Sequence, residues 1–163
     1  MRARSVYVMT DLTDLLIPEA VLADVPVAGK KKLFTHLGQA AHDAWGLDAR
    51  MVTDRIAERE RLGTTGFGSG VAIPHGRIDG IDRVRGLFVR LSQPVDFDAI
   101  DDAPVDLVFM LMSPADAGAD HLKALARVSR AMRDRGFADK LRGAGSGDAL
   151  YALLAGVEAR DAA

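Results

Sequence analysis

Apolar residues recur at helical spacing in three stretches of the chain. The first stretch predicts a helix over 30–45 that ends at Gly46, and the second predicts one over 48–62 with Asp48 as its N-cap. We expect Gly63 to end the second helix in the left-handed conformation, which glycine adopts readily. The third stretch predicts a helix that ends at Gly136, with an apolar face made by Leu122, Leu125, Val128 and Met132.

One run of apolar residues is long enough to mark the centre of a sheet. Residues 105–112 read Val-Asp-Leu-Val-Phe-Met-Leu-Met and stop at Ser113-Pro114. Such a run is typical of a strand that is covered on both faces. Weaker patterns predict strands over 21–27, 71–74 and 86–92, and short helices over 137–141 and 148–157, the last with Ser146 as cap. Strands that alternate with helices predict an α/β fold, a three-layer sandwich in which helices flank a mixed central sheet.

Length, composition and net charge indicate a single soluble domain. The 163 residues show no repeat and no linker, which favours a single domain over 1–163 with its core at about 10–157. A hydrophobic content of 48% and a net charge of −2 are typical of a soluble protein and indicate no nucleic-acid partner. No apolar run is long enough to span a bilayer, and no signal peptide follows the basic start, so we expect a cytoplasmic protein without membrane insertion.

The residues that best suit a functional site lie in one stretch over 63–77, which reads Gly-Thr-Thr-Gly-Phe-Gly-Ser-Gly-Val-Ala-Ile-Pro-His-Gly-Arg. Glycines permit positive φ and the close approach of a ligand, while Pro74 fixes the backbone just before His75. This pattern predicts an imidazole at the end of a strand beside an open loop, whose N–H groups form an anion-binding concavity. The alternative interpretation is a glycine-rich structural connector.

Several familiar sites do not fit this stretch. It lacks the Gly-Lys-[Ser/Thr] ending of a P-loop, and it follows a predicted helix, which reverses the order of the P-loop and of the dinucleotide-binding motif. Gly68-Ser69-Gly70 is only a fragment of the nucleophile elbow of serine hydrolases. The chain has no cysteine, and its four histidines lack metal-ligand spacing. We therefore expect neither a metal nor a cofactor.

Two further positions qualify as partners of His75. His121 lies near the start of the third predicted helix, where α/β proteins bind anions. Either Arg59 or Arg61 can point back to the glycine loop from the end of the second helix. The other histidines, at positions 36 and 42, are interpreted as surface residues of the first helix.

The stretch 59–76 resembles the signature of the type-2 enzyme IIA domain of the bacterial phosphoenolpyruvate phosphotransferase system, the mannitol/fructose class. Residues 97–109 and the His-Leu-x-x-Leu pattern at 121–125 resemble it as well. The resemblance spans about residues 10–155 and is nearest to the nitrogen-regulatory branch, whose members stand alone without fused IIB or IIC domains. It implies that His75 accepts a phosphoryl group from an HPr-like carrier, with His121 and Arg59 matching the histidine and arginine beside the phosphate. The branch regulates partner proteins rather than sugar uptake.

Histidine chemistry agrees with this expectation. A neutral imidazole is nucleophilic, and phosphoryl transfer needs preorganised donors around the phosphate more than covalent help. We expect these donors to come from the glycine loop, namely Thr64, Thr65, Gly66, Gly68 and Gly70. Three functions remain open: a regulatory phosphocarrier, a sugar-transport IIA that passes phosphate to a IIB domain, and a module that senses an anion without covalent transfer.

Overall fold

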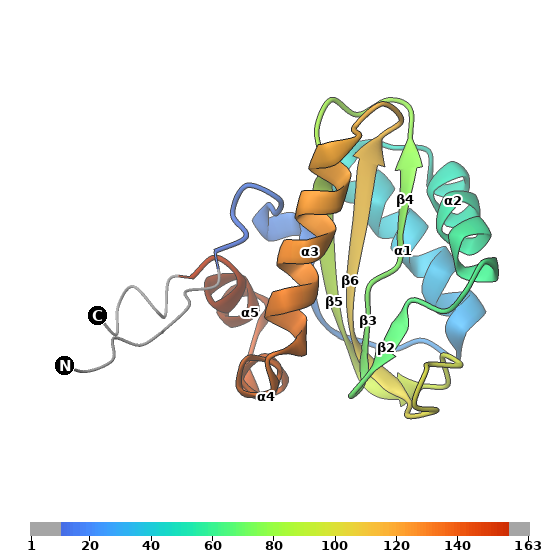
Figure 1. Ribbon diagram of the computed structural model, residues 1–163. Helices are drawn as coiled ribbons and strands as arrows, with labels where there is room; N and C mark the ends of the chain where they lie inside the picture. The colour runs from blue at the N-terminus through green and yellow to red at the C-terminus, as the bar shows by residue number, and fades with distance from the viewer. Residues whose placement is uncertain (1–10, 157–163) are drawn as a thin grey trace.

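The computed structural model describes residues 11–156. The outer limits of the predicted core at 10 and 157 lie outside this range. One mixed sheet occupies the centre of the molecule (Figure 1), with strands in the order β1-β5-β6-β3-β2. Strand β4 also pairs with β6, farther along β6 than the part that pairs with β3. The strands are β1 Val21–Val25, β2 Gly66–Gly68, β3 Val71–Ala72, β4 His75–Ile78, β5 Arg85–Val95 and β6 Val105–Pro114.

Helices cover both faces of this sheet, which confirms the predicted three-layer α/β sandwich. One face carries α1 (Lys30–Trp45) and α2 (Ala49–Arg61). The other carries α3 (Ala119–Arg133), α4 (Arg135–Gly143) and α5 (Gly147–Leu154), as Figure 1 shows. A short 3₁₀ helix at Pro18–Ala20 leads into β1. No helix in the described range is long and apolar enough to cross a membrane.

Strand β6 contributes to both cores, as its apolar run predicts. Val108, Met110 and Met112 pack toward α1 and α2. Leu107, Phe109 and Leu111 point to the opposite face and pack toward α3, α4 and α5. All six side chains are fully buried. Side chains alternate between the faces of a strand, so this register also determines which residues near its end face α3.

The predicted caps are confirmed at three helix ends and wrong at two. Gly46 ends α1 at φ +75°, and the side chains of Asp48 and Ser146 accept hydrogen bonds from the first turns of α2 and α5. Gly63 is not in the left-handed helical conformation, because the helix ends at Leu62 in the right-handed region and Gly63 continues at φ +154°. The third helix ends before Gly136, at Arg133.

The reason for the early end of α3 is a side chain. Asp134 accepts a hydrogen bond from the N–H of Phe137 and so starts α4 two residues before the predicted segment 137–141. The glycine stretch also differs from its prediction as an open loop, since β2 and β3 form an antiparallel hairpin within it. His75 begins strand β4 rather than following a strand, because Ile73-Pro74 separates β3 from β4.

Candidate functional site

His75 lies on the sheet edge formed by β4. It pairs with Leu111 of β6, whose side chain points toward α3, and parallel partners share a face. The next residue, Gly76, faces α2 instead, where a Cβ would lie 3.4 Å from Arg55. The absence of a side chain at Gly76 lets α2 pack directly on β4. The end of α2 and the start of α3 therefore flank the imidazole.

The second histidine predicted from the sequence lies beside the first. The ring centroids of His75 and His121 are 5.7 Å apart, and His121 comes from the first turn of α3. The Nδ1 atom of His121 is 2.6 Å from Oγ of Ser113, which is completely buried at the end of β6. The Nδ1 atom of His75 is 2.8 Å from the carbonyl oxygen of Ile73.

These two hydrogen bonds determine which ring atoms are available. A carbonyl oxygen only accepts, so Nδ1 of His75 carries a proton and Nε2 of the neutral ring holds the lone pair. The Ser113 hydroxyl donates to Nδ1 of His121 when the neutral ring carries its proton on Nε2, and it accepts when Nδ1 is protonated, so it holds the ring in every protonation state. In each ring Nε2 is the nitrogen that remains for a ligand.

The surroundings keep both rings neutral. Burial lowers the pKa of His75 below its ordinary 6.5, and the charge of Arg59 lowers it further, against the opposing influence of the Ile73 carbonyl and of Glu60. Burial also lowers the pKa of His121, followed by the charges of Arg77 and His75. A neutral imidazole is the nucleophilic form of the side chain.

We expect His75 to titrate below pH 6.5 in the folded protein. Between the folded pKa and 6.5 the unfolded chain binds more protons, so the free energy of unfolding decreases as the pH falls through this window. NMR titration of the ring Cε1–H of His75, in native protein and in urea, measures both midpoints. A native midpoint at or above the unfolded one would contradict the argument.

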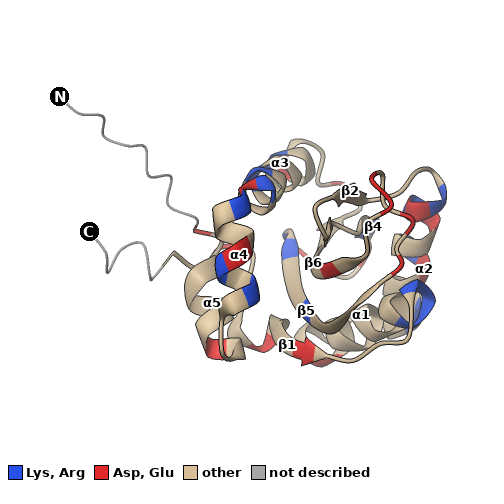
Figure 2. Ribbon diagram, turned by 90° about the horizontal axis from the view of Figure 1, so that it is seen from below, with Lys and Arg blue, Asp and Glu red and all other residues tan. Residues whose placement is uncertain are grey.

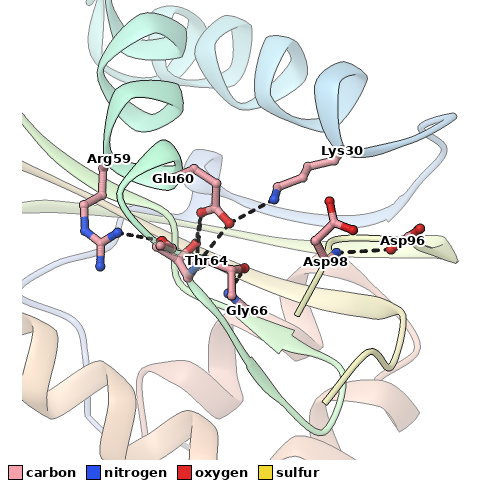
Figure 3. Close-up of polar contacts among 9 residues, drawn as sticks. Lys30, Arg59, Glu60, Thr64, Gly66, Asp96 and Asp98 are labelled. Carbon is pink, nitrogen blue, oxygen red and sulfur yellow. Dashed lines mark hydrogen bonds and ion pairs between the residues drawn. The ribbon is translucent and has the colours of Figure 1, made fainter. Parts of the chain in front are cut away.

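Arg59 and Glu60 come from the last turn of α2. Arg59 donates from Nη1 to the carbonyl of Gly63 at 2.7 Å (Figure 3), and its charge acts on His75. Glu60 accepts from both the N–H and the hydroxyl of Thr65 and forms an ion pair with Lys30 at 3.0 Å. Burial opposes the ionisation of Glu60, but hydrogen bonds from Thr65, the neighbouring threonine and Lys30 outweigh it and lower the pKa. Glu60 thus anchors the segment that follows α2.

The predicted phosphate donors at positions 64–66 make contacts of their own, although Thr65 accepts from the N–H of Ile73 close to His75. Both donors of Thr65 are bonded to Glu60, and the hydroxyl of Thr64 accepts from the N–H of Gly66. Gly66 itself is buried against the loop after β5, where a Cβ would lie 2.9 Å from Phe97.

Strand register places Gly68 and Gly70 far from the imidazole of His75. Gly68 pairs with Val71, which pairs with Leu107, four residues before the Leu111 that pairs with His75. Four residues of strand span about 13 Å. The structure therefore brings together His75 and His121 and the charge of Arg59, but it does not bring the glycines to the imidazole. The histidines at positions 36 and 42 lie on α1, on the other side of the sheet.

Sequence reasoning missed Ser113 as part of the site. The apolar pattern marks this residue only as the end of the central strand. The signal was present, because position 113 continues the alternation of 107, 109 and 111 and so faces the third helix. What the sequence does not provide is the distance to His121, which depends on where α3 begins.

Comparison with known proteins identifies the family. Residues 14–157 match the family described as "Phosphoenolpyruvate-dependent sugar phosphotransferase system, EIIA 2". The chain belongs to this EIIA 2 family. The resemblance inferred from residues 59–76 is thereby confirmed.

The relatives of this EIIA 2 chain include regulatory proteins. The nitrogen regulatory protein of Bradyrhizobium diazoefficiens is 47% identical over 144 residues, which cover 88% of this chain and 94% of the relative. The crystal structure of nitrogen regulatory protein IIA-Ntr from Neisseria meningitidis superposes with a TM-score of 0.81 at 35% identity, over 86% of this chain and 97% of that one. The Escherichia coli mannitol IIA, solved in complex with phosphorylated IIB, shares the fold, with a TM-score of 0.72 at 22% identity over 86% and 97% of the two chains.

Proposed function

We propose that the chain is a regulatory phosphocarrier of a phosphoenolpyruvate-dependent phosphotransferase system, with Nε2 of His75 as the phosphoryl acceptor. The observation that carries this proposal is the hydrogen bond from Nδ1 of His75 to the Ile73 carbonyl. It leaves Nε2 as the nucleophile of a ring that burial keeps neutral. Family membership supports the chemistry, and the names of the relatives support the regulatory purpose.

The transfer step needs little from the protein beyond position and charge. The lone pair of Nε2 attacks the phosphorus of the carrier's phosphohistidine, and the carrier's N–P bond breaks as the new one forms. The Nδ1 proton of His75 stays in place, where the Ile73 carbonyl stabilises the charge that the ring acquires. His121 offers Nε2–H to a phosphoryl oxygen while Ser113 donates to its Nδ1, and Arg59 contributes positive charge.

The surface around the site suits a protein partner. Leu62 at the end of α2 is 85% exposed, and Leu122 in the first turn of α3 is 64% exposed, so apolar groups flank the imidazole on both sides. Arg59 and the exposed Arg77 add positive charge between them. A small HPr-like carrier that docks here in the cytoplasm would bring its phosphohistidine to His75. Regulatory target proteins would then bind the same surface according to its phosphorylation state.

Intact mass spectrometry tests the proposal. After incubation with phosphoenolpyruvate, enzyme I and an HPr-like carrier, we expect one added phosphoryl group that is lost on acid treatment. No added mass with active donors, or a group that survives acid, would contradict it. Rapid onward transfer to a purified IIB would favour a sugar-transport role, and tight calorimetric binding of a phosphorylated metabolite without covalent transfer would favour an anion sensor.

Ser113→Ala is expected to release the His121 ring from its single orientation. The lost hydrogen bond is worth about 1 kcal/mol, so phosphoryl uptake should slow by roughly fivefold. Ring ¹⁵N shifts should change from one tautomer of His121 to a mixture, a readout that does not depend on phosphorylation. Ser113→Thr keeps the hydroxyl and serves as the matched control. An unchanged tautomer in Ser113→Ala would contradict the positioning role.

A further inference from the structure

A cavity of about 350 Å³ lies at the opposite end of α3 from His121. The end of α3, helix α4 and the turn between β2 and β3 surround it, and Figure 2 shows Lys and Arg residues on α4 and at the end of α3. Its lining consists of Ser69, Val71, Met132, Arg133, Arg135, Ala138, Asp139 and Arg142. About 17 Å of helix separate His121 from Met132, so the cavity is distinct from the histidine site.

Two of the three arginines are held in place by the fold. Arg142 donates from Nε and Nη2 to the carboxylate of Asp106, and also from Nη2 to the carbonyl of Ser69. The guanidinium of Arg133 lies 4.2 Å over the ring of Phe67, and its Nε donates to a serine of α3. Preorganised guanidinium groups lose little side-chain entropy when they bind a ligand.

The third arginine, Arg135, is exposed, and its side chain forms no hydrogen bond or ion pair with any described residue. The carboxylate of Asp139 also lines the cavity, 3.8 Å from Arg142 and largely exposed. The charges of the three arginines are opposed by Asp139 and by Asp106, which pairs with Arg142, so a smaller net positive charge remains around the cavity. Its floor is apolar, made by Val71 and the side chains of α3 and α4.

The glycine turn shapes one wall of this cavity. Gly68, Ser69 and Gly70 all have positive φ, and for Ser69 at +59° this conformation costs about 1 kcal/mol. Asp101 holds the turn by accepting from the N–H of Ser69. A Cβ at Gly70 would lie 2.6 Å from Nη2 of Arg142, so glycine is required for the arginine to approach. The glycines that do not reach His75 thus position Arg142.

We propose that this cavity binds a small organic oxyanion, one that joins a phosphate or carboxylate group to a compact apolar body. Planar guanidinium forks match the oxygens of both groups, and the apolar floor accommodates the body. A volume of 350 Å³ is that of a small-molecule site and exceeds what inorganic phosphate fills. This inference does not depend on phosphoryl transfer at His75.

NMR titration of the full chain with phenyl phosphate, benzoate and inorganic phosphate tests the proposal. We expect phenyl phosphate or benzoate to shift the amides of 69–71 and 132–142, with at least roughly tenfold higher affinity than inorganic phosphate. The comparison of phenyl phosphate with benzoate shows which oxyanion the cavity prefers. His75→Ala should bind equally well, which separates this site from the proposed phosphocarrier function.

Variants of single charges sharpen the test. Arg135→Gln removes no contact within the described range and should weaken binding at least roughly fivefold, whereas Asp139→Asn should strengthen it. Arg130→Gln changes an exposed arginine of α3 outside the cavity and should leave affinity unchanged. Equal affinity for organic and inorganic probes, shifts spread over all basic surfaces, or equal losses in Arg135→Gln and Arg130→Gln would overturn the proposal.

Discussion

His75→Ala is expected to abolish the acid-labile phosphoryl group while the protein stays folded. The Nδ1 atom of His75 donates to the Ile73 carbonyl, which leaves Nε2 of the neutral ring with a lone pair that can attack phosphorus. The side chain is half-buried on an edge strand, and its removal leaves the cores on both faces intact. Intact mass after incubation with the phosphoryl donors measures the loss, and circular dichroism verifies the fold.

His121→Ala is the matched control, because it removes a second imidazole whose ring centre is only 5.7 Å away. If His121 stabilises the transferred group and His75 receives it, this variant still becomes phosphorylated but more slowly, by roughly 10²-fold. Substantial labelling of His75→Ala would refute the assignment of the acceptor. Complete loss in a folded His121→Ala would mean that the second ring is essential to the transfer.

The layers of the fold were predictable because hydrophobic periodicity reports burial directly. The unbroken run over 105–112 corresponds to β6, which is covered on both faces. Element ends were less predictable, because single side chains decide them. Asp134 ends α3 because its side chain caps the first turn of α4. After α2, Glu60 binds the N–H of Thr65, and the helix ends without a left-handed glycine cap.

The site residues also divide into those that the sequence predicted and those whose placement depends on the fold. The motif and its resemblance to the EIIA 2 family led to His75, His121 and Arg59 before any geometry was known, and their roles remain part of the proposed function. The sequence did not reveal that the hairpin carries Gly68 and Gly70 to the far end of the sheet, because strand register is a non-local property. The reactive nitrogen likewise became evident only from the contact with the Ile73 carbonyl.

Arg90→Met is expected to lower the free energy of unfolding by about 3 kcal/mol. Arg90 lies in β5 with only 8% of its surface exposed, and its Nη1 donates to the carbonyls of Leu141, Arg142 and Ala144 at the end of α4. Its Nη2 donates to Asp24 of β1 at 3.1 Å. Methionine retains the apolar stem but leaves those carbonyls without their donor, so α4 loses its attachment to the sheet.

Arg85→Met provides the control on the same strand. Arg85 has a single ion pair in the described range, with Asp82 at 3.8 Å, and its loss should cost less than about 1 kcal/mol. Urea denaturation of both variants measures the difference, and equal losses would show that the carbonyl cluster contributes no more than an ordinary surface charge. Since α4 carries Arg135 and Arg142, Arg90→Met should also weaken oxyanion binding at the cavity beside α4, while Arg85→Met leaves it unchanged. A buried arginine of the sheet would then determine both the stability of α4 and the geometry of the cavity that α4 completes.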